Sequence, residues 1–120
     1  MVTKEIKFTV RGQRIDSPVC PPQFAANTVG YIRAVFDFDS EWDGLDILAI
    51  WQSDYAITQS ALDADGTCMV PAEVLDRISP VKVNLVGTTE EDDTLVGRLT
   101  TFPVFALNIT AYAHVGGDQA

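Results

Sequence analysis

Apolar and polar side chains alternate along most of this chain, and the alternation predicts short β-strands. Residues 4–10 carry apolar side chains at every second position, the period of a strand with one buried face. The alternation is clearest over 29–39, where the residues expected to face the core are Ile32, Ala34, Phe36 and Phe38. The apolar run over 45–51 is rich enough to be covered on both faces, although we expect Trp51 to stay partly exposed.

An acidic corner separates these two strands. Residues 40–44 are Ser-Glu-Trp-Asp-Gly, in which Asp43-Gly44 is a turn signal. We therefore predict a β-hairpin over 31–51, with the corner holding two core strands in register. Trp42 has two alternative roles, a plug for the end of a sandwich whose indole N–H bonds to the backbone, or an exposed contact. We favour the plug, because an isolated exposed tryptophan lowers solubility.

Further strands and turns continue the β pattern. Strands are predicted over 55–62, 67–70, 81–86 and 95–109, and Pro103 indicates a bend, a bulge or an edge position in the last of them. Turn signals occur at 88–94 and at 63–66, and the second is expected to close a hairpin onto 67–70. Residues 16–28 contain three prolines and are predicted to form a long connection across an end of the sandwich.

The predicted fold is all-β, an antiparallel β-sandwich of Ig-like or jelly-roll-like type with one short helix. The helix is expected over Pro71–Ile78, because proline suits a first helical position and Val74, Leu75 and Ile78 form one apolar face. With 120 residues, the chain is expected to form a single domain over 1–110, followed by a tail over 111–120.

The net charge argues against nucleic acid and anionic membranes as partners. Seventeen acidic residues against eight basic ones give −9, which repels phosphate groups. No apolar run approaches the roughly 20 residues that a membrane-spanning helix needs, and the first residues do not resemble a signal peptide. We therefore expect synthesis in a cytoplasm, where Cys20 and Cys68 are more often free buried thiols than a disulfide.

Two acidic stretches are candidate calcium sites. The first has acidic side chains at every second position: Asp37, Asp39, Glu41 and Asp43. The second, 63–67, resembles the start of a calcium loop, but Val74 stands where an EF-hand needs a bidentate glutamate. Because calcium requires about six or more oxygen ligands, we interpret the first stretch as a solvated face and the second as a turn, and we expect no metal or other cofactor.

No combination of residues predicts catalysis, and we do not expect an enzyme. His114 is the only histidine and falls in the predicted tail, so it supplies no base to a core serine or cysteine. A glycosidase carboxylate pair would need a cleft that a sandwich of this size rarely builds. The alternative function is a carbohydrate-binding module, whose platform would come from surface aromatic residues: Tyr31, Trp42, Trp51, Tyr55 and Tyr112.

Four motifs in combination resemble a module found in phages and prophages of Gram-positive bacteria. In chain order they are Phe36-x-Phe38-x-x-x-Trp42-x-Gly44-Leu45, Cys68-x-Val70-Pro71-x-Glu73-Val74-Leu75, Val81-x-Val83-x-Leu85-Val86-Gly87 and Arg98-x-Thr100-Thr101. The module is a small β-sandwich domain at the root of phage appendages, of the kind seen at the N-terminus of upper baseplate proteins and in head or tail fibre proteins.

The resemblance implies a phage virion structural protein that attaches a fibre or baseplate component to the particle through protein–protein contacts. It implies other virion structural proteins as partners, a homo-oligomer as the usual assembly and the virion as the location. It implies no active site. The candidate structural or contact residues are Phe36, Phe38, Trp42, Gly44, Trp51 and Pro71, and all of them except Trp51 belong to these motifs.

Overall fold

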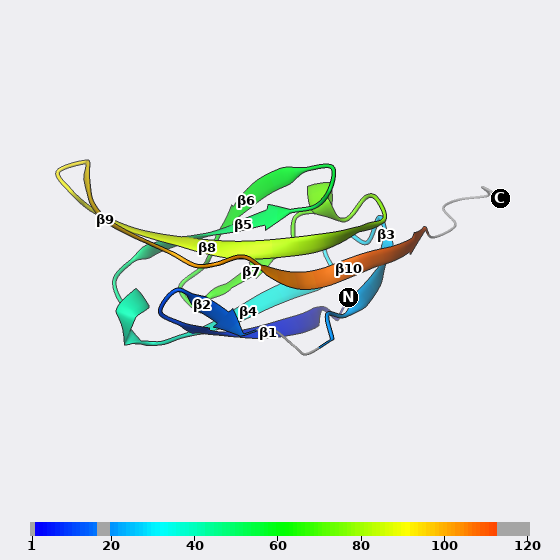
Figure 1. Ribbon diagram of the computed structural model, residues 1–120, viewed down its shortest axis with the longest axis horizontal. Helices are drawn as coiled ribbons and strands as arrows, with labels where there is room; N and C mark the ends of the chain where they lie inside the picture. Colours follow the sequence, from blue (N-terminus) through cyan, green and yellow to red (C-terminus); the bar gives the residue numbers. More distant parts are fainter. Residues whose placement is uncertain (1, 17–19, 113–120) are drawn as a thin grey trace.

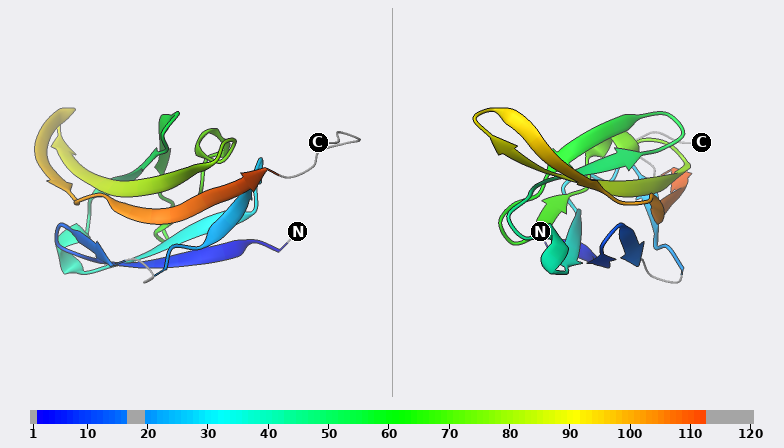
Figure 2. Two further views of the ribbon diagram at one scale, coloured as in Figure 1. Left: turned by 45° about the vertical axis from the view of Figure 1, so that its right-hand side comes forward. Right: turned by 60° about the vertical axis from the view of Figure 1, so that its left-hand side comes forward.

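Two β-sheets packed face to face make up the molecule, whose computed structural model describes residues 2–16 and 20–112, apart from the side chain of Tyr112 (Figures 1 and 2). The first sheet has the strand order β2-β1-β4-β7. Its strands are β1 (Lys4–Arg11), β2 (Arg14–Asp16), β4 (Ile32–Phe38) and β7 (Thr67–Met69).

The second sheet has the order β3-β10-β8-β5-β6, and β9 also pairs with β8. Its strands are β3 (Gln23–Ala26), β5 (Asp46–Gln52), β6 (Ile57–Ala61), β8 (Ser79–Glu91), β9 (Thr94–Thr100) and β10 (Val104–Tyr112). Strand β8 continues through Glu91 and turns at Asp92 and Asp93, both with positive φ, as the mirror-image turns of hairpins require. The tip of this β8–β9 hairpin projects beyond the rest of the sandwich (Figure 1).

The all-β sandwich is confirmed, but its strand pairing is mixed. Of the eight pairings among the described residues, two are parallel, β1 with β4 and β3 with β10. After β2 the chain adds β3 to the edge of the second sheet and returns to the first sheet as β4. This detour supplies the crossover that a parallel β1–β4 pair needs. The proline-rich connection predicted over 16–28 therefore contains a short edge strand, β3, which begins directly after Pro22 and itself contains no proline.

The predicted inward face of β4 is confirmed. Ile32, Ala34 and Phe36 are buried and Phe38 is half-buried. The rings form an aromatic row that runs from β1 to the corner, with centroid separations of 5.0 Å for Phe8 and Phe36, 6.1 Å for Phe36 and Phe38, and 5.4 Å for Phe38 and Trp42. Such contacts contribute beyond simple burial of apolar area.

The predicted hairpin over 31–51 is wrong. Strand β4 pairs with β1 and β7, whereas β5 pairs with β6 and β8, so the acidic corner carries the chain from one sheet to the other. The predicted hairpin at 63–66 is wrong for the same reason, because this turn joins β6 in the second sheet to β7 in the first. A turn between two sheets uses the same Asp-Gly chemistry as a hairpin, so the residues alone do not distinguish them.

The predicted helix over 71–78 is also wrong. Only one 3-10 turn forms, η2 (Ala72–Val74), with Pro71 at its N-cap position and no side-chain cap. Val74 and Leu75 are buried, but Ile78 is 44% exposed and does not extend the apolar face. A segment with so little to bury cannot offset the cost of ordering further helical turns.

Trp51 lies fully inside the sandwich, at 0% exposure, which contradicts the predicted partial exposure. Within the described residues, its indole N–H is buried without a hydrogen-bond partner. The Cys68 thiol lies near this indole N–H, but its sulfur is outside hydrogen-bond geometry and is at most a weak acceptor. Burial raises the pKa of the Cys68 thiol to about 11, and the indole N–H opposes this rise. Both cysteines are free and Cys68 is buried, as predicted, but Cys20 is exposed, which contradicts its predicted burial.

Candidate functional site

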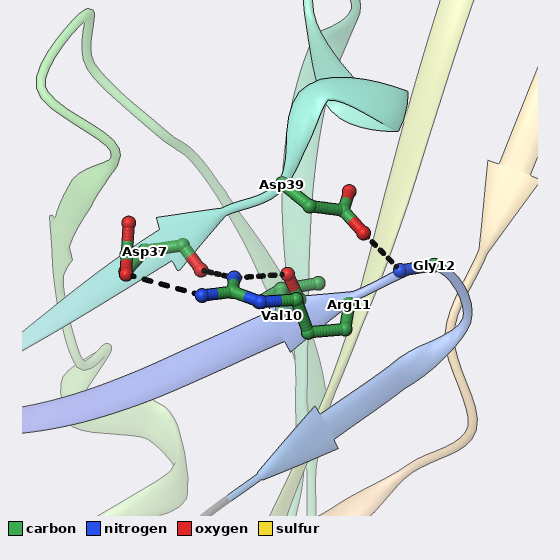
Figure 3. Close-up of polar contacts among 5 residues, drawn as sticks. All are labelled: Val10, Arg11, Gly12, Asp37 and Asp39. Atoms are coloured by element: carbon green, nitrogen blue, oxygen red, sulfur yellow. Dashed lines mark hydrogen bonds and ion pairs between the residues drawn. The ribbon is translucent and has the colours of Figure 1, made fainter.

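The corner between β4 and β5 is built on Asp39, which follows the last residue of β4. One oxygen of its carboxylate accepts a hydrogen bond from the backbone N–H of Glu41 (3.2 Å) and caps η1 (Ser40–Trp42). The other oxygen accepts from the backbone N–H of Gly12 in the β1–β2 turn (2.9 Å; Figure 3). Aspartate suits this position because its short carboxylate reaches free backbone donors at a helix start. Asp39 therefore holds the corner against the neighbouring turn.

Trp42 is the plug that the sequence favours, with 2% of its surface exposed. Its indole Nε1–H donates to the carbonyl oxygen of Gly12 (2.9 Å), so the corner engages both backbone polar groups of this glycine. Gly12 has a φ of +58°, a conformation that costs glycine little. The corner and the β1–β2 turn thus close this end of the sandwich together.

Arg11 ties β1 to the end of β4 beside the corner. Its guanidinium donates to the carbonyl oxygens of Val10 (2.9 Å) and Asp37 (3.2 Å), and it lies 3.6 Å from the Asp37 carboxylate (Figure 3). Both side chains are exposed, so this ion pair contributes little to stability. Asp37 and Asp39 are thus turned to separate partners. In the described part of the chain, no group of three or more His, Cys, Asp or Glu residues is placed to hold a metal ion.

The 63–66 turn is held by Asp63, as its interpretation as a turn requires. The Asp63 carboxylate accepts from the backbone N–H of Asp65 (3.1 Å) and from both the backbone N–H (3.2 Å) and the hydroxyl (2.8 Å) of Thr67. Gly66 has a φ of +77°, and a Cβ there would lie 2.9 Å from the carbonyl oxygen of Phe36. The turn is therefore fixed beside the last residues of β4.

The Asp63 bonds predict a specific loss of stability in acid. Hydrogen bonds from the hydroxyl and backbone N–H of Thr67 lower the pKa of the Asp63 carboxyl from its ordinary value of 3.8. A lowered folded-state pKa contributes stability that is complete above about pH 5 and is lost as the pH falls through the folded value. We expect the melting temperature of Asp63→Asn and of Thr67→Val to fall less steeply than that of the wild type below about pH 5. Equal slopes in thermal melts would contradict this role of Asp63.

The corner and the 63–66 turn enclose a groove at one end of the sandwich, with a volume of about 910 Å³. Of its eighteen lining residues, all among those described, nine are apolar, six are acidic and none is basic. Phe38, Leu45, Ile47, Leu48 and Leu62 are half-buried, so they offer apolar surface to the groove. Thr88 and Glu90, on the β8 strand of the β8–β9 hairpin, also line it.

Two strand ends open onto this groove. Strand β7 pairs only with Arg33–Val35, although β4 continues to Phe38. Strand β6 pairs only with Leu48–Gln52, although β5 begins at Asp46. Strands β6 and β7 therefore both end at the groove, where the 63–66 turn connects them. The connection uses part of each edge, because Phe36 N–H donates to the carbonyl oxygen of Gly66 (2.9 Å) and Leu62 N–H donates to that of Ile47 (3.1 Å). Beyond these bonds, β4 at 37–38 has no described strand beside it on this side, and such an edge can accept an extended segment.

The structure brings four of the six predicted site residues together. Phe36, Phe38, Trp42 and Gly44 line the groove, whereas Trp51 and Pro71 do not. Leu48, Leu62 and Glu90 also line the groove, although the sequence pattern did not predict them as site residues, and they come from other strands and loops. Their only signal was local, an apolar or acidic side chain near a turn, and their convergence depends on which turns cross between the sheets.

The predicted aromatic platform does not form from the residues that the structure describes. Trp42 and Trp51 are buried, Tyr31 is half-buried, and Tyr55 is 59% exposed. The Arg77 guanidinium lies over the Tyr55 ring, 5.0 Å from its centroid, and so covers one face of this ring. The Tyr112 side chain and His114 lie outside the described residues. The two tryptophans are thus unavailable for stacking on a sugar ring.

Fold and groove define the class of protein as a small all-β module of two mixed sheets. Over the described residues, no helix is long and apolar enough to span a bilayer. No protein-family model matches the sequence, and no curated protein matches it.

Among solved structures, the chain is similar to the N-terminal domain of phage TP901-1 ORF48, with a TM-score of 0.55 and 10% sequence identity. The match covers 94% of this chain and 100% of that chain. At this identity the likeness is one of fold.

Proposed function

We propose that the chain is a phage virion structural module that attaches a fibre or baseplate component to the particle through protein–protein contacts. The observation that carries the proposal is the fold match to the phage TP901-1 ORF48 N-terminal domain across nearly the whole of both chains. The four sequence motifs that resemble phage appendage modules support the proposal independently of this fold match. In this role the module binds other virion proteins, assembles with copies of itself and catalyses no reaction.

Apolar side chains at the surface support protein contacts. Ile57 and Phe105 are exposed at the two flanks of the second sheet, and Leu95 and Val96 are exposed on the projecting β8–β9 hairpin. Single exposed apolar side chains are common on soluble proteins, so these positions are available for protein contacts and do not by themselves define an interface. The carbohydrate-binding alternative loses its main support, because both tryptophans of its platform are buried.

Detection of the chain in purified particles tests the attachment role. Particles released from cells that carry the gene would be separated on a density gradient and analysed by quantitative mass spectrometry. We expect the chain to sediment with the particles in a fixed ratio to the capsid protein. The control is the chain produced alone and added to finished particles of an unrelated phage, which should stay in the soluble fraction. Recovery only in the soluble fraction of its own lysate would contradict the proposal.

A further inference from the structure

We propose that the groove between the corner and the 63–66 turn binds an extended segment of a partner protein, in which apolar side chains alternate with lysine or arginine. This inference rests on the attachment role proposed above and gives it a surface and a partner chemistry. It is carried by three properties of the groove: its charge, its apolar floor and its incompletely paired strand ends.

The charge of the groove selects a basic partner. Its six acidic residues are Asp37, Asp43, Asp46, Asp63, Asp65 and Glu90. Arg11 compensates Asp37, and Thr67 and the backbone N–H of Asp65 bind the Asp63 carboxylate. The other four carboxylates form no ion pair within the described residues. A second copy of this chain, with a net charge of −9, is a poor occupant because it adds like charge.

The floor of the groove selects an apolar side chain between the basic ones. Phe38 and Leu45 reach it from the two sides of the corner, and Leu62 reaches it from the 63–66 turn. All three are half-buried and pack against the core, so the floor is preformed. A preformed apolar pocket with a charged rim binds an anchor side chain at low ordering cost.

The strand ends select an extended backbone. On the groove side, the edge of β4 at 37–38 lies beyond the bond from Phe36 N–H to the carbonyl oxygen of Gly66 (2.9 Å) and has no strand neighbour among the described residues. On β5, the carbonyl oxygen of Ile47 already accepts from Leu62 N–H (3.1 Å), so β4 supplies the open edge. Addition of a segment to such an edge uses main-chain hydrogen bonds for affinity and alternate side-chain pockets for specificity. In an extended segment, alternate residues point in opposite directions, so leucine or phenylalanine faces the floor while lysine faces the acidic rim.

A peptide titration tests the inference. The probe is a synthetic heptapeptide in which lysines alternate with leucine and phenylalanine, and its control has glutamates in place of the lysines. Amide chemical shifts of the ¹⁵N-labelled chain would report where the peptide binds, and the titration would give its affinity. We expect shifts confined to the corner, the 63–66 turn and residues 88–90 of β8. We also expect weaker binding at higher ionic strength, because surface charges are screened.

A pair of charge-matched variants separates site binding from general attraction. The groove variant replaces the four carboxylates that form no ion pair: D43N/D46N/D65N/E90Q. The control variant removes the same charge at exposed positions outside the groove: E5Q/D54N/E73Q/D76N. We expect the groove variant to bind the lysine peptide about tenfold more weakly, which corresponds to a few tenths of a kcal/mol for each of the four exposed charge pairs lost. We expect the control variant to bind within about twofold of the wild type.

Three results would overturn the inference: equal weakening in the two variants, shifts that map elsewhere, or equal binding of the glutamate peptide. Because the replaced side chains are exposed and make no hydrogen bond or ion pair among the described residues, both variants should retain the wild-type fold, which their amide spectra verify. Particle analysis is a separate measurement. If the chain is present in particles but does not bind the peptide, the attachment role stands and the groove proposal is wrong. If the chain binds the peptide but is absent from particles, only the groove proposal stands.

Discussion

Replacement of Trp42 by alanine is expected to lower the free energy of unfolding by about 3–5 kcal/mol. The side chain is 2% exposed, continues the aromatic row through Phe38 and donates its indole N–H to Gly12. Its loss leaves a cavity at the end of the sandwich and removes the bond between the corner and the β1–β2 turn. Domains of this size are stable by only about 5–15 kcal/mol, so the change is a large part of the total.

Urea denaturation followed by far-ultraviolet circular dichroism would measure this loss. Trp42→Phe keeps part of the ring packing but removes the bond to Gly12, so we expect a smaller loss of about 1–2 kcal/mol. Tyr55→Ala removes an aromatic residue that is 59% exposed and should cost less than about 1 kcal/mol. An unchanged denaturation midpoint for Trp42→Ala would show that the corner is not held by this side chain.

The strand pattern of the sequence predicts much of the fold, because burial of one sheet face imposes a period of two. This is why Ile32, Ala34 and Phe36 face the core as expected. The same pattern contains no information on the neighbour of a strand. Strand β4 therefore shows the same alternation whether it pairs with β5 in a hairpin or with β1 in a parallel pair. Pairing is decided by the crossing turns, and their residues resemble those of hairpins.

The groove was less predictable than the strands. Trp42 was correctly predicted as a plug because a large buried side chain with one polar group needs both packing and a hydrogen-bond partner. Leu62 and Glu90 were missed because they lie far from the corner in sequence and reach it only through the sandwich topology. Partial exposure was predicted for Trp51, but its side chain is buried. A buried indole N–H usually has an acceptor, and this one has none within the described residues.

Replacement of Gly87 by alanine is expected to destabilise the fold by about 1–3 kcal/mol. Gly87 lies in β8 directly beneath the corner, and a Cβ there would approach Leu45 Cδ1 and Trp42 Cζ3 to 2.8 Å each and Trp42 Cε3 to 3.0 Å. The indole cannot move aside, because its ring contacts Phe38 and its N–H is bonded to Gly12. The absence of a side chain at Gly87 is therefore what lets Trp42 close the sandwich.

A double-mutant cycle distinguishes this clash from a general loss of strand stability. Since Trp42→Ala removes the ring that a Cβ at position 87 would strike, the two substitutions together should cost less than the sum of their separate effects, by about 1 kcal/mol or more. Gly97→Ala is the matched control, because its Cβ would meet only the methyl group of Thr89, at 2.9 Å, on the projecting hairpin. That side chain can rotate away, so we expect a loss below about 1 kcal/mol. Strict additivity in the Gly87 cycle would mean that Gly87 and Trp42 do not constrain each other.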